Sequence, residues 1–402
     1  MFKKDNFFKS YFTKSREHKK NIEKTKKIFK SVKIDIENYK IPLLSSYDKE
    51  YDSDFSKNTV KKFSKYKNII IIGMGGSILG IKSIHSFFYK KIKKNVFFLD
   101  NLDSDLYSKF KKIKNLNNSC FILISKSGNT LETLANFNFI FSKILTRKKL
   151  IIITEMKNNT LMNIANKYEA EIIEHKEFIS GRYSVLSEPG MFPATLMGLD
   201  PIKFKNLKRL IKDKIFVSSL IQNVAGIFTL NLKGLRNSVI FNYDSSLNDL
   251  GYWYQQLVAE SLGKKGKGVN PSLSFGPKDH HSLLQLYLDG PKDKFFTFFT
   301  SINTNEKHKV KKNIFPENMN FLKNKELKSI INSQCTAVKR IFKLKGIPYR
   351  EILFKKRNEE ELGYAFTFFV LETIILSRLM NVNPFDQPEV EQVKIETKKI
   401  LR

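Results

Sequence analysis

The sequence predicts an α/β protein of two domains, each a three-layer αβα arrangement with a mainly parallel sheet flanked by helices. From residue 67 onward, short apolar runs alternate with longer stretches of helical character. This alternation is typical of βαβ units, whose parallel strands are buried on both faces and therefore read as apolar runs. A chain of 402 residues is long enough for two such domains. The predicted strands are residues 68–72, 95–99, 120–124, 150–154, 238–243, 294–300 and 348–354.

The domain organisation that we expect has four segments. Residues 1–62 form a basic helical segment without a catalytic motif, and residues 63–200 form the first α/β domain. Residues 201–380 form the second, with the helical stretch 204–230 joining or flanking the two domains. Residues 381–402 contain a proline-bounded turn and a final amphipathic helix.

Charge is the unusual property of the composition. The formal net charge is +32, a value that is often found in proteins that bind nucleic acid or acidic membranes. The lysines are spread through the whole chain, however, and they accompany abundant Ile, Asn and Phe, which share A/T-rich codons. Because genomic base composition explains this excess, we expect no dedicated nucleic-acid partner.

The sequence also indicates a cytoplasmic protein without a membrane span. The longest apolar runs, such as residues 366–380, are interrupted by Glu372 and fall short of about 18 clean residues. Residues 1–30 alternate charged and aromatic side chains and lack the apolar core of a signal peptide. Cys120 and Cys335 are the two cysteines, and we expect both to be buried, reduced thiols.

A candidate general base lies in the helical stretch that begins at Trp253. Gln256 and Glu260 are one helical turn apart, so they share a face, and Leu257 makes that face otherwise apolar. A carboxylate in this position is held on a rigid element and is partly desolvated. A general base needs both conditions, because its geometry must be fixed and its pKa raised toward the working pH.

Two adjacent histidines follow this helix in the sequence. Asp279 is predicted to be the N-cap of another helix, which contains His280 and His281. Adjacent side chains on a helix point about 100° apart, so the two histidines do not favour a shared metal ion. The sequence therefore predicts no metal site.

A glycine-rich loop follows the strand at residues 68–72 and reads Gly-Met-Gly-Gly-Ser-Ile-Leu-Gly. Ile78 stands where a dinucleotide-binding loop needs its third glycine, and Lys82 lies one residue too late for a nucleotide P-loop. Two interpretations stay open for this loop. Gly76 and Ser77 contact an anion or a sugar hydroxyl, or the glycines form a tight turn with close helix packing.

A second loop, Ser-Lys-Ser-Gly-Asn-Thr, follows the strand at residues 120–124. Ser125, Ser127 and Thr130 place hydroxyl groups just before a helix, and Asn129 with Glu132 resembles a capping box. Hydroxyl donors and free helix N–H groups suit a phosphate dianion. A helix that is merely capped needs one such hydroxyl rather than three.

Two further strings complete the pattern, Gly-Arg-Tyr-Ser at residues 181–184 and Asn-Pro-Phe-Asp-Gln-Pro-Glu-Val-Glu-Gln-Val-Lys at residues 383–394. Together with the two loops and the stretch 253–285, they resemble the motifs of the glucose-6-phosphate isomerase family, in the family's order. The resemblance implies two sugar-isomerase-type domains and the interconversion of glucose 6-phosphate and fructose 6-phosphate through a cis-enediolate. It implies no metal and no cofactor, because cationic side chains polarise the substrate.

The resemblance also implies a role for each matching residue. Glu260 is the base that moves the proton between C2 and C1, His281 opens the sugar ring with help from Lys394, and Arg182 stabilises negative charge. The substrate is bound by Gly76, Ser77, Ser125, Lys126, Ser127, Thr130, Gln256 and Gln387. In this family the catalytic histidine comes from the neighbouring subunit of a homodimer, so His281 is expected to act in trans.

This sequence departs from the family pattern at some positions, and two alternative functions stay open. The departures are Asn129, Ser180, Val258, His280 and Glu389. One alternative is an isomerase that also accepts mannose 6-phosphate. The other is a sugar-phosphate-binding protein of the same fold without catalytic activity.

Overall fold

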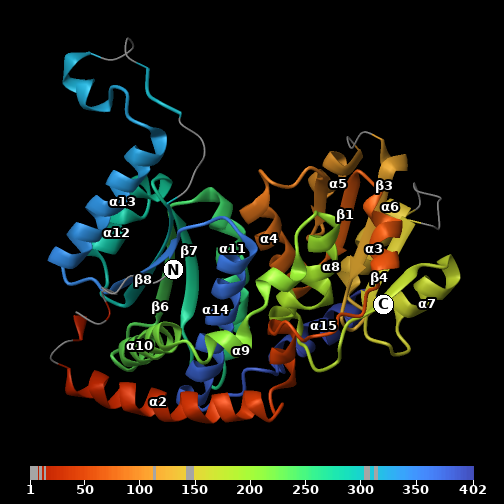
Figure 1. Cartoon of the computed structure of the whole chain (residues 1–402), viewed down its shortest axis with the longest axis horizontal. Helices are drawn as coiled ribbons and strands as arrows, with labels where there is room; N and C mark the ends of the chain where they lie inside the picture. Colours follow the sequence, from red (N-terminus) through yellow and green to blue (C-terminus); the bar gives the residue numbers. More distant parts are fainter. Residues whose placement is uncertain are drawn as a thin grey trace.

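The computed structural model describes residues 8, 11–12, 15–111, 115–141, 149–302, 308–311 and 316–402. Two parallel sheets lie side by side with helices on their faces (Figure 1), which confirms the predicted fold class. The five-stranded sheet has the order β2-β1-β3-β4-β5 and the four-stranded sheet the order β7-β6-β8-β9. The strands are β1 (Asn68–Gly73), β2 (Asn95–Leu99), β3 (Ser119–Ile124), β4 (Leu150–Thr154), β5 (Glu171–Glu174), β6 (Asn237–Asn242), β7 (Asn270–Phe275), β8 (Lys294–Ser301) and β9 (Tyr349–Phe354).

Helices precede, connect and follow the strands. The α-helices are α2 (Arg16–Glu37), α3 (Lys57–Ser64), α4 (Leu79–Phe88), α5 (Ser104–Lys111), α6 (Leu131–Phe141), α7 (Thr160–Tyr168), α8 (Glu188–Leu196), α9 (Leu207–Leu210), α10 (Lys214–Leu232), α11 (Asn248–Leu262), α12 (Leu284–Asp289), α13 (Leu327–Leu344), α14 (Glu359–Met380) and α15 (Glu389–Ile400). The short 3-10 helices are η1 (Pro42–Tyr47), η2 (Gly75–Ser77), η3 (Leu116–Asn118), η5 (Gly181–Leu186), η6 (Pro201–Phe204), η7 (Ser245–Leu247), η8 (Lys278–His281) and η9 (Glu317–Leu322).

Each predicted strand is present, but β5 and β7 were not predicted from the sequence. Both are edge strands, β5 in the five-stranded sheet and β7 in the four-stranded sheet. Glu171 and Glu174 flank the two isoleucines of β5, and β7 contains Pro271. Edge strands tolerate charged residues and proline because one side of their backbone forms no hydrogen bonds with a neighbouring strand. The apolar runs that identify central strands are therefore absent from both.

The strands alternate their side chains between two apolar layers. In β1, Ile69 and Ile71 belong to a large core cluster between the two sheets, whereas Ile70 and Ile72 belong to a cluster on the opposite face. Residues of α4, α8, α10, α11 and α14 complete the large cluster, and Figure 1 shows α4, α8, α11 and α14 in the middle of the molecule. In β6, Ile240 belongs to the large cluster and Phe241 to a third cluster, so each sheet is buried on both faces, as the apolar runs predicted. The predicted boundaries between the four segments stay predictions.

The helical stretch expected at 204–230 is broken in the structure. α10 begins at Lys214, where the carboxylate of Asp213 accepts a hydrogen bond of 2.8 Å from the backbone N–H of Phe216. Within the described residues, α10 and α14 are long and apolar enough to cross a membrane by length and composition, but most of each helix is buried inside the protein. Glu372 of α14 is fully buried and pairs with Arg350 of β9, Nη2 to Oε1 at 3.0 Å.

Candidate active site

The carboxylate of Glu260 lies near the end of α11, and its neighbours confirm the predicted helical spacing. Nε2 of Gln256, one turn earlier, donates a hydrogen bond of 2.7 Å to Oε1 of Glu260. The Glu260 side chain is 31% exposed, so it is partly desolvated but still reachable by a ligand. Oε1 of Gln256 is buried and has no hydrogen-bond partner among the described residues. This orphaned acceptor is suited to a hydroxyl donor of a bound ligand.

Arg182 lies on η5 and is almost completely buried. Its guanidinium has five N–H donors, and all five find acceptors. The acceptors are Oγ of Ser261 at 2.9 Å, Oε2 of Glu260 at 3.2 Å, Oε1 of Gln387, the carbonyl of Pro384 at 2.5 Å and the carbonyl of Asp386 at 3.1 Å. One buried cation therefore connects the end of α11 to the turn at residues 383–388. The structure brings Arg182, Glu260, Gln256 and Gln387 together.

The glycine-rich loop after β1 packs directly against the backbone that carries Arg182. A Cβ atom added to Gly76 would lie 2.3 Å from the carbonyl carbon of Gly181 and 2.5 Å from the backbone nitrogen of Arg182. Only a residue without a side chain allows this approach of η2 to η5. The close-packing interpretation of the loop is thus confirmed for Gly76. A ligand contact by Gly76 and by Ser77, which is partly exposed, stays a prediction.

The hydroxyl-rich loop begins beside the glycine-rich loop. β1 and β3 are neighbouring parallel strands, with Gly73 paired with Ile124, so both loops leave the carboxyl edge of the sheet at the same level. Ligands of open α/β sheets bind at this edge. Oγ of Ser125 and Oγ1 of Thr130 are hydrogen-bonded at 2.8 Å, and the side chain of Ser127 is exposed. The backbone closes this loop at Gly128, where φ is +67° and an added Cβ would lie 2.0 Å from Oδ1 of Asn159.

Two details of this loop differ from the sequence prediction. Oδ1 of Asn129 accepts hydrogen bonds from the backbone N–H and the hydroxyl of Thr160, at 3.0 and 2.8 Å, so it braces the start of α7 rather than forming a capping box with Glu132. Nζ of Lys126 donates to the carbonyl of Glu177 at 2.7 Å, and burial lowers the pKa of this lysine. A phosphate contact by Lys126 stays a prediction.

The histidine pair lies on η8, and its two rings have different surroundings. Asp279 is not the N-cap of a longer helix. It lies inside η8, and its carboxylate accepts from the backbone of Phe275 at 2.6 Å and from two serine hydroxyls. Nε2 of His280 is 2.6 Å from the hydroxyl of Tyr243, and burial together with the neighbouring His281 lowers the pKa of His280. His281 is exposed.

Lys394 lies on α15, a helix without a buried residue. Its ammonium pairs with Glu391 at 2.5 Å, and 60% of its side chain is exposed. Among the described residues, no hydrogen bond or ion pair joins Lys394 or His281 to Glu260 or Arg182. The structure of one chain therefore assembles half of the predicted catalytic set, and the roles of Lys394 and His281 stay predictions.

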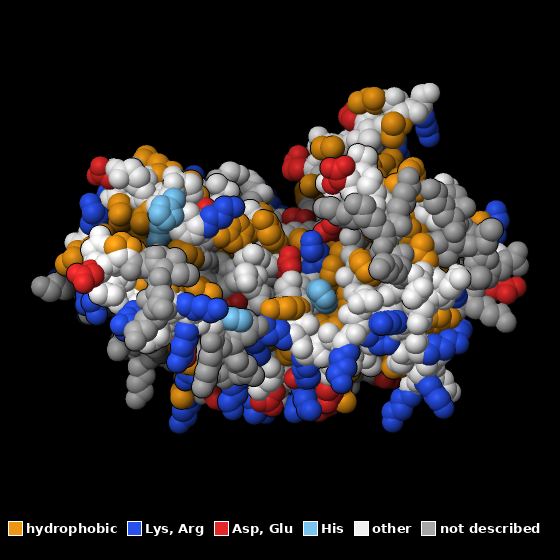
Figure 2. Space-filling model, turned by 90° about the horizontal axis from the view of Figure 1, so that it is seen from above, with side chains coloured by type: hydrophobic (Ala, Val, Ile, Leu, Met, Phe, Trp, Pro, Cys, Tyr) orange, Lys and Arg blue, Asp and Glu red, His pale blue; other side chains and the backbone are white. Residues whose placement is uncertain are grey.

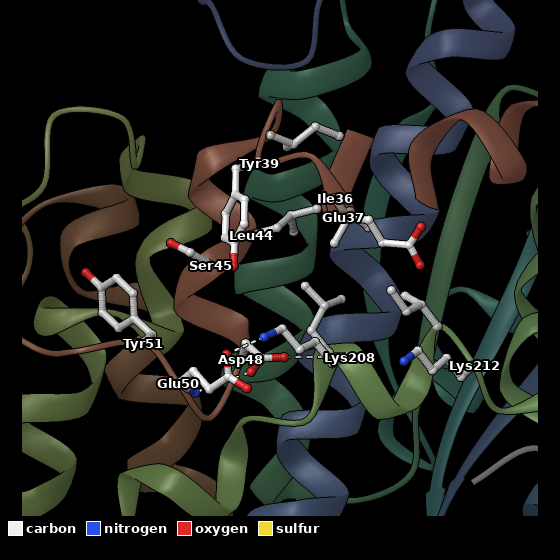
Figure 3. Close-up of a pocket in the computed structure, with 13 residues that line it drawn as sticks. Ile36, Glu37, Tyr39, Leu44, Ser45, Asp48, Glu50, Tyr51, Lys208 and Lys212 are labelled. Atoms are coloured by element: carbon white, nitrogen blue, oxygen red, sulfur yellow. Dashed lines mark hydrogen bonds and ion pairs between the residues drawn. The ribbon is translucent and has the colours of Figure 1, made fainter. Parts of the chain in front are cut away.

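A pocket of about 540 Å³ opens beside Glu260. Its walls come from the end of α11, the turn at 383–388 and the first residues of α15, including Lys264, Gln387 and Val390. Another pocket, of about 500 Å³, lies between the end of α2, η1 and α9. Figure 3 shows the charged side chains of this second pocket, where Lys208 contacts Asp48 and Glu50. It contains none of the predicted site residues, whereas Glu260 and Gln387 line the first pocket, which is therefore the candidate active site.

Two residues of this site were not predicted from the sequence. Ser261 accepts from Nε of Arg182 and lies 2.8 Å from the hydroxyl of Tyr183, and Lys264 contacts the turn at 383–388. Both follow Glu260 closely in sequence, but helical spacing turns Ser261 about 100° away from it. No periodicity or motif spacing could reveal that Arg182 lies on that side of α11.

Solved structures confirm the fold. A hypothetical protein from Thermus thermophilus has a TM-score of 0.85 and 22% identity, with all of both chains covered. A glucose-6-phosphate isomerase from Chlamydia trachomatis has a TM-score of 0.72 and 17% identity, covering 89% of this chain and 78% of that one. The fold that these structures share with this chain is the arrangement of two parallel sheets with helices on their faces.

The sequence comparisons define the family. The family described as phosphoglucose isomerase matches residues 45–402. The glucose-6-phosphate isomerase of Methanocaldococcus jannaschii is 36% identical over 355 residues, which cover 86% of each chain. The chain belongs to the phosphoglucose isomerase family.

Proposed function

We propose that this protein is an aldose–ketose isomerase that interconverts glucose 6-phosphate and fructose 6-phosphate. The observation that carries the proposal is the contact of Glu260 with both Arg182 and Gln256, at 3.2 and 2.7 Å, beside an open pocket. A rigid carboxylate next to a buried guanidinium is what proton transfer between two carbons requires, because charge develops on the adjacent oxygen. Family membership supports the same reaction.

The phosphate group of the substrate is held by the loop at residues 125–130. Ser125, Ser127 and Thr130 offer hydroxyl donors at the start of α6, and the backbone N–H groups of the helix add to them. These donors bind a dianion without neutralising it. Gln387, which contacts the guanidinium of Arg182, and the loop at residues 75–77, which packs against the backbone of Arg182, contact the sugar.

The reaction begins with ring opening, an acid–base step that His281 performs with Lys394. Glu260 then removes the proton from C2 and returns it to C1, so the intermediate is a cis-enediolate. Arg182 and Lys394 stabilise the negative charge that develops on oxygen. General acid–base catalysis of this kind contributes roughly 10²–10⁴ in rate, and preorganised cations supply much of the remainder. The metabolic place of this reaction is glycolysis and gluconeogenesis.

The active form in this proposal is a cytoplasmic homodimer in which His281 is contributed in trans. Three observations support it: His281 is exposed on η8, its neighbour His280 faces inward to Tyr243, and one chain leaves His281 without a contact to Glu260. A closed two-fold dimer then contains two identical composite sites. Lys and Arg side chains are scattered over the face shown in Figure 2, interleaved with Asp and Glu, which supports the expectation of no dedicated nucleic-acid partner.

A coupled assay of the purified protein tests the proposal. Fructose 6-phosphate is supplied, and the glucose 6-phosphate formed is oxidised by a dehydrogenase whose nicotinamide product is followed by absorbance. We expect turnover in the wild-type chain and loss of most of it in Glu260→Gln. Mannose 6-phosphate is then supplied as the substrate, and formation of fructose 6-phosphate from it would identify an enzyme of dual specificity. Binding of the sugar phosphates without turnover would identify the non-catalytic alternative.

A further inference from the structure

Lys264 follows the C-terminal end of α11 and points at the turn at residues 383–388. Its ammonium donates to the carbonyl of Asn383, to the carbonyl of Asp386 at 2.6 Å and to Oδ1 of Asp386 at 2.6 Å. A lysine has three donors, and here the three acceptors all belong to one segment. Only 13% of the side chain is exposed. This degree of burial distinguishes Lys264 from the solvated lysines that cover most of the chain.

Arg182 binds the same turn. Its Nη2 donates to the carbonyl of Asp386 at 3.1 Å, so this oxygen accepts from both cations. Arg182 also contacts Glu260 and Gln387 directly, and it is therefore part of the candidate catalytic site. Within the described part of the chain, the hydrogen bonds and ion pair of Lys264 all lie on the turn. The two cations therefore share one acceptor, the carbonyl of Asp386, but only Arg182 also contacts Glu260.

The turn determines where α15 begins. Inside the turn, Asn383 donates to Asp386 at 2.9 Å, and the ring of Phe385 lies 6.0 Å from the ring of Tyr183. α15 starts directly after the turn, at Glu389, and has no buried residue along its described length. A helix without a buried face takes its direction from the segment that leads into it. The contacts of Lys264 with the turn therefore affect the position of α15 and of Lys394 on it.

We propose that Lys264 is a positioning residue of the isomerase, which holds the turn at residues 383–388 so that Gln387 and Lys394 are presented to the substrate. The inference rests on the function proposed above and adds a residue to it. Lys264 itself touches neither the base nor its partner Arg182 and acts through the turn. A displacement of a reacting group by about 1 Å can cost roughly 10²-fold in rate, so a small shift of this segment is enough to be measured.

Two readouts on Lys264→Met test the proposal, one structural and one kinetic. Amide hydrogen exchange of residues 383–402 should become faster while the melting temperature stays close to that of the wild type. The kcat for isomerisation should fall about 10-fold or more, and Lys264→Arg should restore part of it. The matched control is Lys343→Met, which removes an exposed lysine of α13 that does not line the pocket beside Glu260 and should behave as the wild type.

A double-mutant cycle separates positioning from a general structural effect. If Lys264 acts through α15, Lys264→Met should cost little further activity in a chain that already contains Lys394→Ala, because the two losses share one cause. The proposal is wrong if the amides of residues 383–402 exchange at the wild-type rate in Lys264→Met. It is also wrong if kcat in the double variant falls by the product of the factors measured for Lys264→Met and Lys394→Ala separately. A wild-type chain without isomerase activity would instead overturn the proposed function, and the exchange measurement would still decide whether Lys264 holds the turn.

Discussion

Nη1 of Arg182 lies 3.2 Å from Oε2 of Glu260, and this ion pair joins the two halves of the molecule. Arg182 lies on η5, which follows the last strand of the five-stranded sheet, whereas Glu260 lies on α11, which follows the first strand of the four-stranded sheet. The guanidinium is buried and the carboxylate is partly exposed, so the pair offers its acidic member to the pocket. The reactive groups are thus fixed by the packing of two sheets rather than by one loop.

The first prediction concerns Glu260→Gln. The amide keeps the shape of the side chain but cannot accept the C2 proton, so we expect kcat to fall by roughly 10²–10⁴ while substrate binding is largely retained. Glu260→Asp keeps a carboxylate and should retain more activity than the amide, because only its reach is changed. Steady-state kinetics of both variants, with competitive phosphate-ester inhibitors as the binding measure, provide the test. A kcat near the wild-type value in Glu260→Gln would remove Glu260 as the base.

The second prediction concerns the loop that we assign to the phosphate. Ser125→Ala combined with Thr130→Ala removes two hydroxyls that lie 2.8 Å apart. Each lost hydrogen bond to a charged group costs about 1.5–3 kcal/mol, so the affinity for both sugar phosphates should fall by at least about 100-fold if both hydroxyls bind the dianion. Thr336→Ala, an exposed threonine on α13, is the control. Unchanged affinity in the double variant would show that the phosphate binds elsewhere.

The central strands could be predicted from the sequence because burial on both faces leaves uninterrupted apolar runs, as in residues 69–72. The same criterion misses β5 and β7, whose charged residues and Pro271 are acceptable only because they lie at sheet edges. Whether a strand lies at the edge depends on the assembled sheet, so a local sequence pattern does not reveal it. The broken stretch before α10 was missed for a similar reason, since Asp213 is recognisable as a cap only once the helix start is known.

Contacts within one helix of the site could be predicted from the sequence, whereas contacts that depend on tertiary packing could not. The spacing of Gln256 and Glu260 determines their contact, and the structure confirms it. The contact between Lys264 and Asp386 depends instead on how a turn 122 residues later folds back. Gly76 was ambiguous in the sequence because a close approach of two backbones and a ligand contact both require glycine.

A third prediction concerns acid sensitivity. His175 is completely buried, and burial lowers its pKa from the ordinary 6.5 to about 4. Between these two values the unfolded chain binds a proton that the folded chain does not, so stability is complete above pH 6.5 and is lost as the pH falls toward 4. The contribution is about 3 kcal/mol, from about 1.4 kcal/mol for each pKa unit. Burial lowers the pKa of His18 to about 4 as well, so the two losses add.

His175→Asn isolates one of these contributions. The amide can replace the hydrogen bond from Nδ1 to the carbonyl of Lys176 without titrating. Chemical denaturation at a series of pH values should therefore show a shallower loss of stability between pH 6.5 and 4 than in the wild type. Identical slopes for His175→Asn and the wild type would contradict the assignment.

The last prediction tests whether His281 acts in trans. In a closed dimer with two composite sites, each site takes Glu260 from one chain and His281 from the other. Inactive Glu260→Gln and His281→Ala chains are mixed in equal amounts, unfolded and reassociated. About half of the dimers should be mixed, and each mixed dimer then has one site with both defects and one with neither. About one quarter of the wild-type activity should return, since half the sites of half the dimers are intact.

If His281 acts within its own chain, the same experiment gives a different recovered activity. If His281 serves the Glu260 of its own chain, every site in a mixed dimer keeps one defect, and no activity returns. A tag on one of the two variants allows the mixed dimers to be purified, and their activity should then reach about half that of the wild type per dimer. Purified mixed dimers that are no more active than the two parent variants would show that His281 acts within its own chain. Because His281 is exposed and His280 is held by Tyr243 at 2.6 Å, we expect activity to return.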